Sequence, residues 1–195
     1  MILHACSTLI ANAPLTAHAC TRFSRVYATR ITSHYMYDQT RVKAVALSKE
    51  GEKLKAAGDM AGAEAKFKAA VESYPTHPYA AAWYGEILYN KGQLDEAKVH
   101  FENSIKSAPY FPDAHYFLGD VYRQQNNPAK SAEHYGRVVN ASPRDQDAWF
   151  MLGSMLSQIP GKEAEAVDAL VKHLRINPGD NEAKEMHKKL SKQLK

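Results

Sequence analysis

Cysteine is almost missing from this 195-residue sequence, and its two cysteines, Cys6 and Cys20, both lie within the first twenty residues. The rest of the chain contains no thiol, which excludes a disulfide framework and a cysteine-ligated metal site from most of the molecule. With 45% hydrophobic residues, a chain of this length can bury a core without such cross-links. We therefore expect a domain that folds through apolar packing alone.

Long apolar runs and clustered basic residues are lacking as well. No stretch approaches the roughly 18 to 20 consecutive apolar residues of a transmembrane helix, so no membrane span is expected. The formal net charge is +4, but residues 1–42 hold four arginines against the single acid Asp38, which leaves only +1 for the remainder. Nucleic-acid binding requires several clustered cations to displace counterions from phosphates. This nearly neutral body is not expected to bind nucleic acid.

The motifs of an active site or a cofactor site are also missing. No glycine-rich phosphate loop precedes a helix, and there is no His-Glu-x-x-His sequence. His100 and His134 are separated by the same interval as Gly85 and Gly119. We interpret these histidines as exposed side chains on the convex side of the fold, because two histidines without a third ligand make a poor metal site. The sequence predicts a protein that is not an enzyme and holds no metal or cofactor.

What the sequence does contain is a strict period. Glycine recurs at every thirty-fourth position in Gly51, Gly85, Gly119 and Gly153, and the prolines Pro75, Pro109 and Pro143 keep the same interval. A small residue is followed four positions later by a large one in Ala63 with Phe67, Ala97 with Phe101, Ser131 with Tyr135 and Ala166 with Leu170. Such a period indicates stacked supersecondary units. Pro178 arrives one residue late, which places a one-residue insertion near residues 159–162.

The residues around these glycines carry a family resemblance. Leu118-Gly119 with Tyr122, and Trp149 with Leu152-Gly153, match the first-helix pattern of the tetratricopeptide repeat (TPR) family. The chain resembles this family over residues 44–178. The resemblance implies an all-α, right-handed solenoid of about four helix pairs. A glycine inside a helix costs up to about 1 kcal/mol relative to alanine, so we expect each one to permit close contact between paired helices.

Three segments follow from this period. Residues 1–42 form a leader, residues 43–178 form the TPR domain, and residues 179–195 form a C-terminal capping helix. The last segment places Ala183, Met186, Leu190 and Leu194 on one helical stripe. A repeat stack needs such a cap because its terminal repeat would otherwise expose an apolar face.

The leader has the composition of an organelle transit peptide. Residues 1–37 contain three arginines and no Asp, Glu or Lys. The stretch from Arg25 to Ala28 resembles a mitochondrial processing site, so we expect a mitochondrial protein. Two alternatives remain open: a cytoplasmic protein whose translation begins at Met36, and a secretory signal that ends at Ala17-His18-Ala19.

In the TPR family the first helices line the concave side, which is the usual ligand surface. The residue after each glycine is Glu52, Glu86, Asp120 or Ser154, which gives three acids in one row. The groove residues expected to contact a partner are Glu52, Tyr79, Glu86, Tyr89, Tyr116, Asp120, Arg123 and Phe150. Tyrosines are favoured at binding hot spots, and acids steer cations. We therefore expect a protein or peptide partner with basic and apolar groups, while Trp83 and Phe117 are expected to pack between repeats.

One ligand class of the family is not expected. TPR domains that bind the C-terminal carboxylate of chaperones place cations and an asparagine in the groove. The matching positions here hold Ser48, Glu52, Asp113 and Phe117. The function implied is a protein–protein interaction scaffold or adaptor, with a mitochondrial assembly factor as its most specific form. The alternatives are a structural subunit that uses its convex face and an RNA-binding helical repeat.

Overall fold

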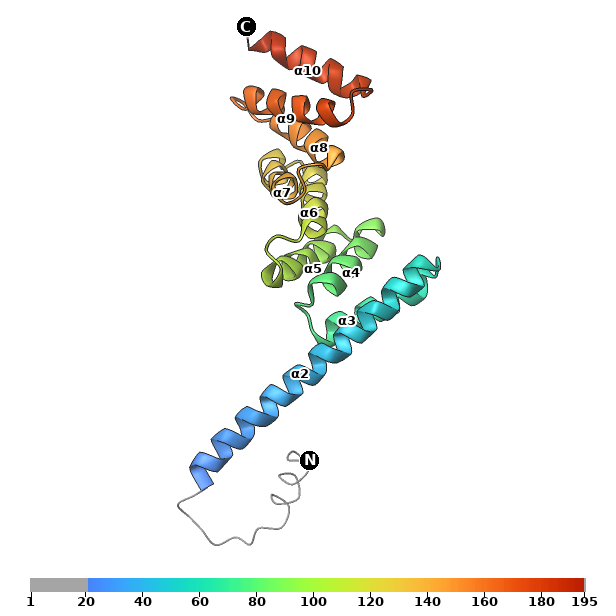
Figure 1. Ribbon diagram of the computed structural model, residues 1–195, viewed down its shortest axis with the longest axis vertical. Coiled ribbons are helices and arrows are strands. Elements are labelled where there is room, and N and C mark those ends of the chain that lie inside the picture. Colours follow the sequence, from blue (N-terminus) through green and yellow to red (C-terminus); the bar gives the residue numbers. More distant parts are fainter. Residues whose placement is uncertain (1–20, 195) are drawn as a thin grey trace. The chain divides into compact units, whose positions relative to one another are not determined.

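The structure is a computed structural model that describes the backbone of residues 21–194 and the side chains of residues 39–194. Over these residues it consists of α-helices without any β-strand: α2 (Thr21–Ala56), α3 (Met60–Ser73), α4 (Pro78–Asn90), α5 (Leu94–Ser107), α6 (Pro112–Gln124), α7 (Pro128–Ala141), α8 (Gln146–Leu156), α9 (Glu163–Ile176) and α10 (Asn181–Gln193). The chain divides into two compact units, residues 1–39 and 40–195. Figure 1 shows the helices of the second unit following one another in chain order. The all-α repeat fold is confirmed.

Helix α2 extends into the segment that the sequence assigns to the leader. It begins at Thr21, so residues 21–42 are helical up to the first repeat. Residues 21–50 contain neither glycine nor proline, and nothing in this stretch would end a helix. Both cysteines and the secretory cleavage site lie outside the described residues. Among the described helices, none combines the length and apolar composition that crossing a bilayer requires.

The four periodic glycines lie where the two helices of a pair touch. A Cβ atom placed on each of them would come within 2.8 to 2.9 Å of a large side chain on the second helix, and the pairs are Gly51 with Phe67, Gly85 with Phe101, Gly119 with Tyr135 and Gly153 with Leu170. The small residue four positions before the large one also lies close to the glycine. In the third pair this residue is Ser131, whose Oγ donates a hydrogen bond to Gly119 O at 2.7 Å. The expected close contact is confirmed, and a large side chain covers each glycine.

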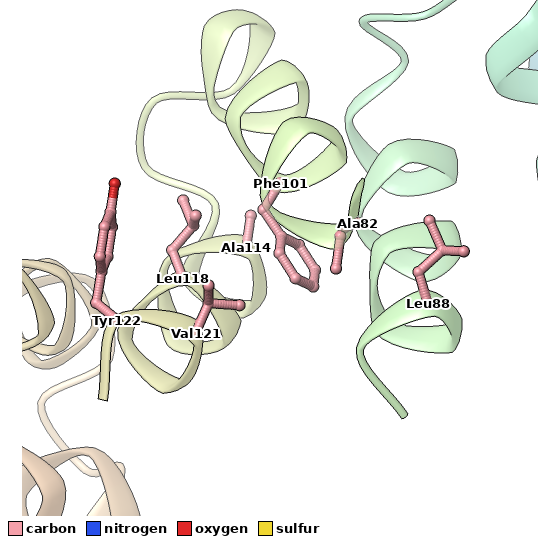
Figure 2. Close-up of a cluster of buried hydrophobic side chains, with 8 residues drawn as sticks. Ala82, Leu88, Phe101, Ala114, Leu118, Val121 and Tyr122 are labelled. Atoms are coloured by element: carbon pink, nitrogen blue, oxygen red, sulfur yellow. The ribbon is translucent and has the colours of Figure 1, made fainter. Parts of the chain in front are cut away.

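The core runs through the stack as a series of these buried side chains. Phe67, Phe101, Tyr135 and Leu170 are fully buried. Figure 2 shows Phe101 of α5 lying between Ala82 of α4 and Ala114 of α6, so one ring joins its own helix pair to the next. Burying a side chain of this size contributes about 1.5 to 3 kcal/mol.

The turn inside each helix pair has a period that the sequence reasoning missed. The backbone takes a positive φ at Gly58 (82°), Gly92 (78°), Asn126 (55°) and Gly161 (82°). The first three follow one another by one period each, and Gly161 comes one position later than the period requires. Glycine and asparagine tolerate this left-handed conformation better than other residues. The longer last interval confirms the insertion, which lies in the connection between α8 and α9.

Helix α10 buries only part of the apolar stripe that the sequence places on it. Ala183 and Leu190 are buried, Met186 packs against the same cluster, and Leu194 is 49% exposed. Asp180 caps the helix by accepting a hydrogen bond from Ala183 N at 3.0 Å. Ala183 also follows the buried Ala148 by one period plus the inserted residue, so α10 occupies the position of a first helix in an incomplete fifth pair.

The glycine contact can be tested by one substitution at two positions. We expect Gly119→Leu to lower the free energy of unfolding by about 1 to 3 kcal/mol, because its side chain would collide with Tyr135. The matched control is Gly136→Leu in α7, where a Cβ meets no atom within 4 Å. The free energy of unfolding of the control variant should rise by about 0.5 to 1 kcal/mol, because leucine has a higher helix propensity than glycine. Urea unfolding of both variants measures the difference, and equal effects would contradict this account of the packing.

Candidate functional site

Side-chain contacts link the first helices of successive pairs into one surface. Lys55 Nζ of α2 lies 2.7 Å from Glu86 Oε2 of α4. Tyr89 of α4 accepts a hydrogen bond from Gln124 of α6, and its ring lies 5.7 Å from that of Phe117. A hollow of about 240 Å³ between α6 and α8 is lined by Pro112, Asp113, Tyr116, Phe117, Val138, Asp145 and Asp147. We call this surface of α2, α4, α6 and α8 the first-helix face.

Two of the three acids in the predicted row, Glu86 and Asp120, are neutralised within the protein. Glu86 is half-buried and pairs with Lys55, whose ammonium also lies 3.9 Å from the centroid of the Trp83 ring. Asp120 is only 8% exposed. A buried carboxylate is costly unless it is paired and hydrogen-bonded. Of the three acids in the row, Glu52 is exposed, and no ion pair involves it in the described part of the chain.

The cost of burying the Asp120 carboxylate is offset by hydrogen bonds from both helices of its own pair. Its Oδ1 accepts hydrogen bonds from Arg123 Nη2 at 2.9 Å and from the hydroxyl of Tyr135 at 2.8 Å. Tyr135 is the ring that covers Gly119, and it is fully buried. Burial and the nearby charge of Asp120 raise the pKa of the Tyr135 hydroxyl, so it remains a donor. The Asp120 carboxylate is therefore satisfied within its own pair, whereas the Arg123 side chain remains 39% exposed.

The aromatic residues expected in the groove differ in what they offer a partner. Tyr89 and Phe150 are half-buried, and the Phe150 ring lies 5.4 Å from that of His173. Tyr116 meets Tyr135 edge to face at 5.5 Å. Burial, together with the charges of Asp120 and Asp147, raises the pKa of Tyr116 to about 12. These three rings are partly exposed on consecutive first helices.

Tyr79 lies apart from the other groove residues. It is 53% exposed, and its ring packs against Phe111 at 5.1 Å. Tyr79 and Tyr89 stand ten residues apart on α4, which corresponds to roughly 15 Å along the helix. The other two aromatic residues behave as predicted: Phe117 stacks on Phe101 at 5.3 Å, and Trp83 packs against a core cluster.

The first-helix face continues onto α10, which the sequence reasoning treated mainly as a cap, with partner contact through its lysines as the alternative. A hollow of about 490 Å³ is lined by Ser157, Glu182, Glu185, Met186, Lys189, Leu190 and Gln193. The spacing from Ala148 to Ala183, one period plus the insertion, was the signal that could have found it. This end of the face carries the cation Lys189 as well as the acids Glu182 and Glu185.

The prediction that His100 and His134 are exposed is wrong. Both rings are half-buried: His100 packs edge-on against Tyr84 at 4.8 Å, and His134 stacks on Tyr122 at 5.4 Å. His115 donates from Nε2 to Pro109 O, so in its neutral form it accepts at Nδ1 from His134 Nδ1 at 3.0 Å. In the described residues no group of three or more His, Cys, Asp or Glu side chains is placed to hold a metal ion.

These buried imidazoles predict a pH-dependent stability. Burial lowers the pKa of His77, His100 and His134, in the last case to about 4. As the pH falls below about 6.5, the unfolded chain takes up protons that the folded chain does not. The stability present at pH 7.5 is therefore lost progressively towards pH 4. We expect His134 alone to account for about 1 to 2 kcal/mol between pH 7.5 and pH 5.

Urea unfolding at the two pH values measures this loss. His134→Phe keeps a ring on Tyr122 but cannot titrate, so the variant should lose less stability at pH 5 than the wild type. An equal loss in both proteins would show that His134 does not contribute.

Comparison with known proteins agrees with this architecture. The tetratricopeptide repeat family model matches residues 54–109 and 91–159, which together exceed half of the chain. No curated protein sequence matches this chain.

Three solved structures illustrate the similarity in fold. YrrB, a TPR protein described as having an unusual peptide-binding site, is 22% identical with a TM-score of 0.68, and the match covers 75% of each chain. MamA is 19% identical with a TM-score of 0.61, over 77% of this chain and 87% of MamA. The first TPR of Spaghetti (RPAP3), bound to the HSP90 peptide SRMEEVD, is 20% identical with a TM-score of 0.53, over 58% of this chain and 90% of that domain. The periodic glycines, the turns and the family match lead to one conclusion: the chain belongs to the tetratricopeptide repeat family.

Proposed function

We propose that this protein is a scaffold or adaptor that holds a segment of a partner protein on its first-helix face. The observation that carries the proposal is the row of partly exposed rings, Tyr89, Tyr116 and Phe150, on three consecutive first helices. Aromatic rings supply large contact area at low entropic cost. The descriptions of YrrB as peptide-binding and of the Spaghetti domain as peptide-bound add support from the same fold.

The partner segment is apolar with at least one basic group. Glu86 and Asp120 already have cations beside them, so a basic side chain would engage Glu52 or the hollow beside Tyr116. Three aspartates, Asp113, Asp145 and Asp147, line that hollow. Partial desolvation of its carboxyl group, followed by the charge of Glu86, raises the pKa of Asp113. The negative charges around the hollow favour an incoming cation over an anion. A terminal carboxylate would be repelled there.

The protein acts by binding rather than by catalysis, and its most specific role is that of an assembly factor in mitochondria. This location is inferred from the arginine-containing, acid-poor composition of residues 1–37. The N-terminus of the endogenous mature protein, read by mass spectrometry, tests it. A start near Ala28 supports import and cleavage, whereas a start at Met36 contradicts it.

The first-helix face is tested by photo-crosslinking from single positions. A benzophenone amino acid in place of Tyr89 or Phe150 should capture one defined partner in cell extract, whereas the same residue in place of Tyr110 should not. Tyr110 is the matched control, because it is an aromatic residue that is 80% exposed outside this face. Capture of the same partner from all three positions would contradict the assignment of the face.

The basic group of the partner is tested with Glu52→Lys. Glu52 is exposed, so reversing its charge should leave stability within about 0.5 kcal/mol of the wild type. We expect the affinity for the captured partner to fall by about threefold to tenfold, with the larger effect at low salt. Unchanged affinity at low salt would remove the basic group from the proposal without removing the aromatic contact.

A further inference from the structure

The spaces between successive second helices are filled from within the protein in the first three pairs. Beside α5, the ring of His100 packs on Tyr84. Between α5 and α7, the ring of His134 stacks on Tyr122, and the ammonium groups of Lys98 and Lys130 lie 5.0 and 5.1 Å from the centroid of the same ring. Tyr122 is only 8% exposed as a result.

In the corresponding space between α7 and α9 the residues at these positions are shorter, although the Lys172 ammonium lies 4.5 Å from the centroid of the Trp149 ring at its α8 side. Counting one period along the chain, with the extra residue added beyond the insertion, Tyr122 corresponds to Leu156, Lys98 to Ala132, His134 to Ala169 and Lys130 to Glu165. Each replacement is shorter than the residue it corresponds to. Ala132 and Ala169 are also shorter than Glu64 and His100 one period earlier still, whereas Leu156 and Glu165 match Leu88 and Glu96 there. Two adjoining hollows of about 490 and 400 Å³ result, and both are lined by Leu152, Leu156 and Glu165. We call these two hollows together the α7–α9 slot.

The α7 wall of the slot contains a glycine that no close contact in the described residues requires. A Cβ on Gly136 would meet no atom within 4 Å, in contrast to 2.8 Å at Gly119. Inside a helix such a glycine costs about 1 kcal/mol relative to alanine. Ala129 and Ala132 line the same wall in the two preceding turns. Together these small residues would let the backbone of a helix from another protein approach α7 closely.

The charges on the rim also differ between the two walls. On α9 and the connection before it, Lys162 pairs with Glu165, and Lys172 pairs with Asp168 at 2.9 Å. Glu133 and Arg137 on α7 are exposed and one turn apart, and neither makes an ion pair within the described part of the chain. An incoming helix with a cation and an acid one turn apart would complement them.

We propose that the α7–α9 slot is a docking site for an amphipathic helix of a partner protein, which inserts a large apolar side chain over Leu152 and Leu156 and pairs its charges with Glu133 and Arg137. The inserted side chain takes the place that Tyr122 and His134 fill in the preceding pair. The slot has α7 and α9 as its walls and Leu152 and Leu156 of α8 at its base. Its lining includes none of Tyr89, Tyr116 and Phe150, so the proposal does not depend on those rings binding a partner.

The test uses the full-length chain and a displayed library of helical peptides with one randomised face. Peptides enriched on the wild-type protein are synthesised, and their affinities are measured for two variants. Gly136→Leu fills the slot at a position where the fold has room. Glu102→Leu makes the equivalent change one period earlier, on the outside of α5, and is the matched control.

We expect the enriched peptides to share an aromatic or large aliphatic anchor, to bind the wild type and Glu102→Leu equally, and to bind Gly136→Leu at least about tenfold more weakly. Because Gly136→Leu should also melt at a higher temperature than the wild type, a loss of binding cannot be a loss of folding. The double variant Glu133→Lys and Arg137→Glu should bind these peptides more weakly than the wild type does. It should bind peptides with the opposite order of charges more tightly.

Three results would overturn the proposal. Binding of the enriched peptides to Gly136→Leu as tightly as to the wild type would show that they do not use the slot. Failure to enrich any peptide with a dissociation constant below about 1 mM would show that the slot does not bind helices. Self-association of the wild type in sedimentation, abolished by Gly136→Leu, would assign the slot to a second copy of the chain.

Discussion

The contact between a helical glycine and a large side chain of the paired helix is the interaction on which the rest of the structure depends. It occurs once in each pair, with a large side chain placed where the glycine has no Cβ. Any larger residue at the glycine would push the second helix away, because packed cores tolerate added methylenes poorly. Since the contact is the same in every pair, it also fixes which residues of the first helices face outward. The core thereby sets the register of the binding surface.

The same contact limits what the surface can do. In the third pair the ring over the glycine is a tyrosine, and its hydroxyl passes through the pair to reach Asp120 on the first-helix face. A buried phenol needs an acceptor, and a buried carboxylate needs donors, so the two groups satisfy each other. Asp120, which the sequence pattern predicts as a ligand contact, is thus already hydrogen-bonded to a side chain of the core. Glu52, whose pair has Phe67 in place of the tyrosine, is free of this demand.

Features that repeat could be predicted from the sequence, and features that depend on a partner in space could not. The glycine and proline periods predict the helix pairs and the insertion, and the helical spacing of Ala183, Met186 and Leu190 predicts the packed side of α10, because each reflects a local backbone or packing requirement. The burial of Asp120 and of His134 escaped prediction because their partners, Tyr135 and His115, lie on the other helix of the pair. The turn period was visible in Gly58, Gly92 and Gly161, but its third member is Asn126, which interrupted the pattern.

Departures from the period carry a different kind of information from the period itself. Where the repeat is kept, each side chain is explained by the neighbour it packs against, as His134 is by Tyr122. In the last pair Ala132 and Ala169 are shorter than their counterparts in both earlier spaces, while the glycine in the α7 wall costs helix stability without a close contact in the described residues. Several independent positions that change in the same sense, around one hollow, are better explained by a common external contact than by separate relaxations of the fold. In a repeat protein, the earlier pairs supply the internal control for that inference, since the same backbone is seen there with its spaces filled.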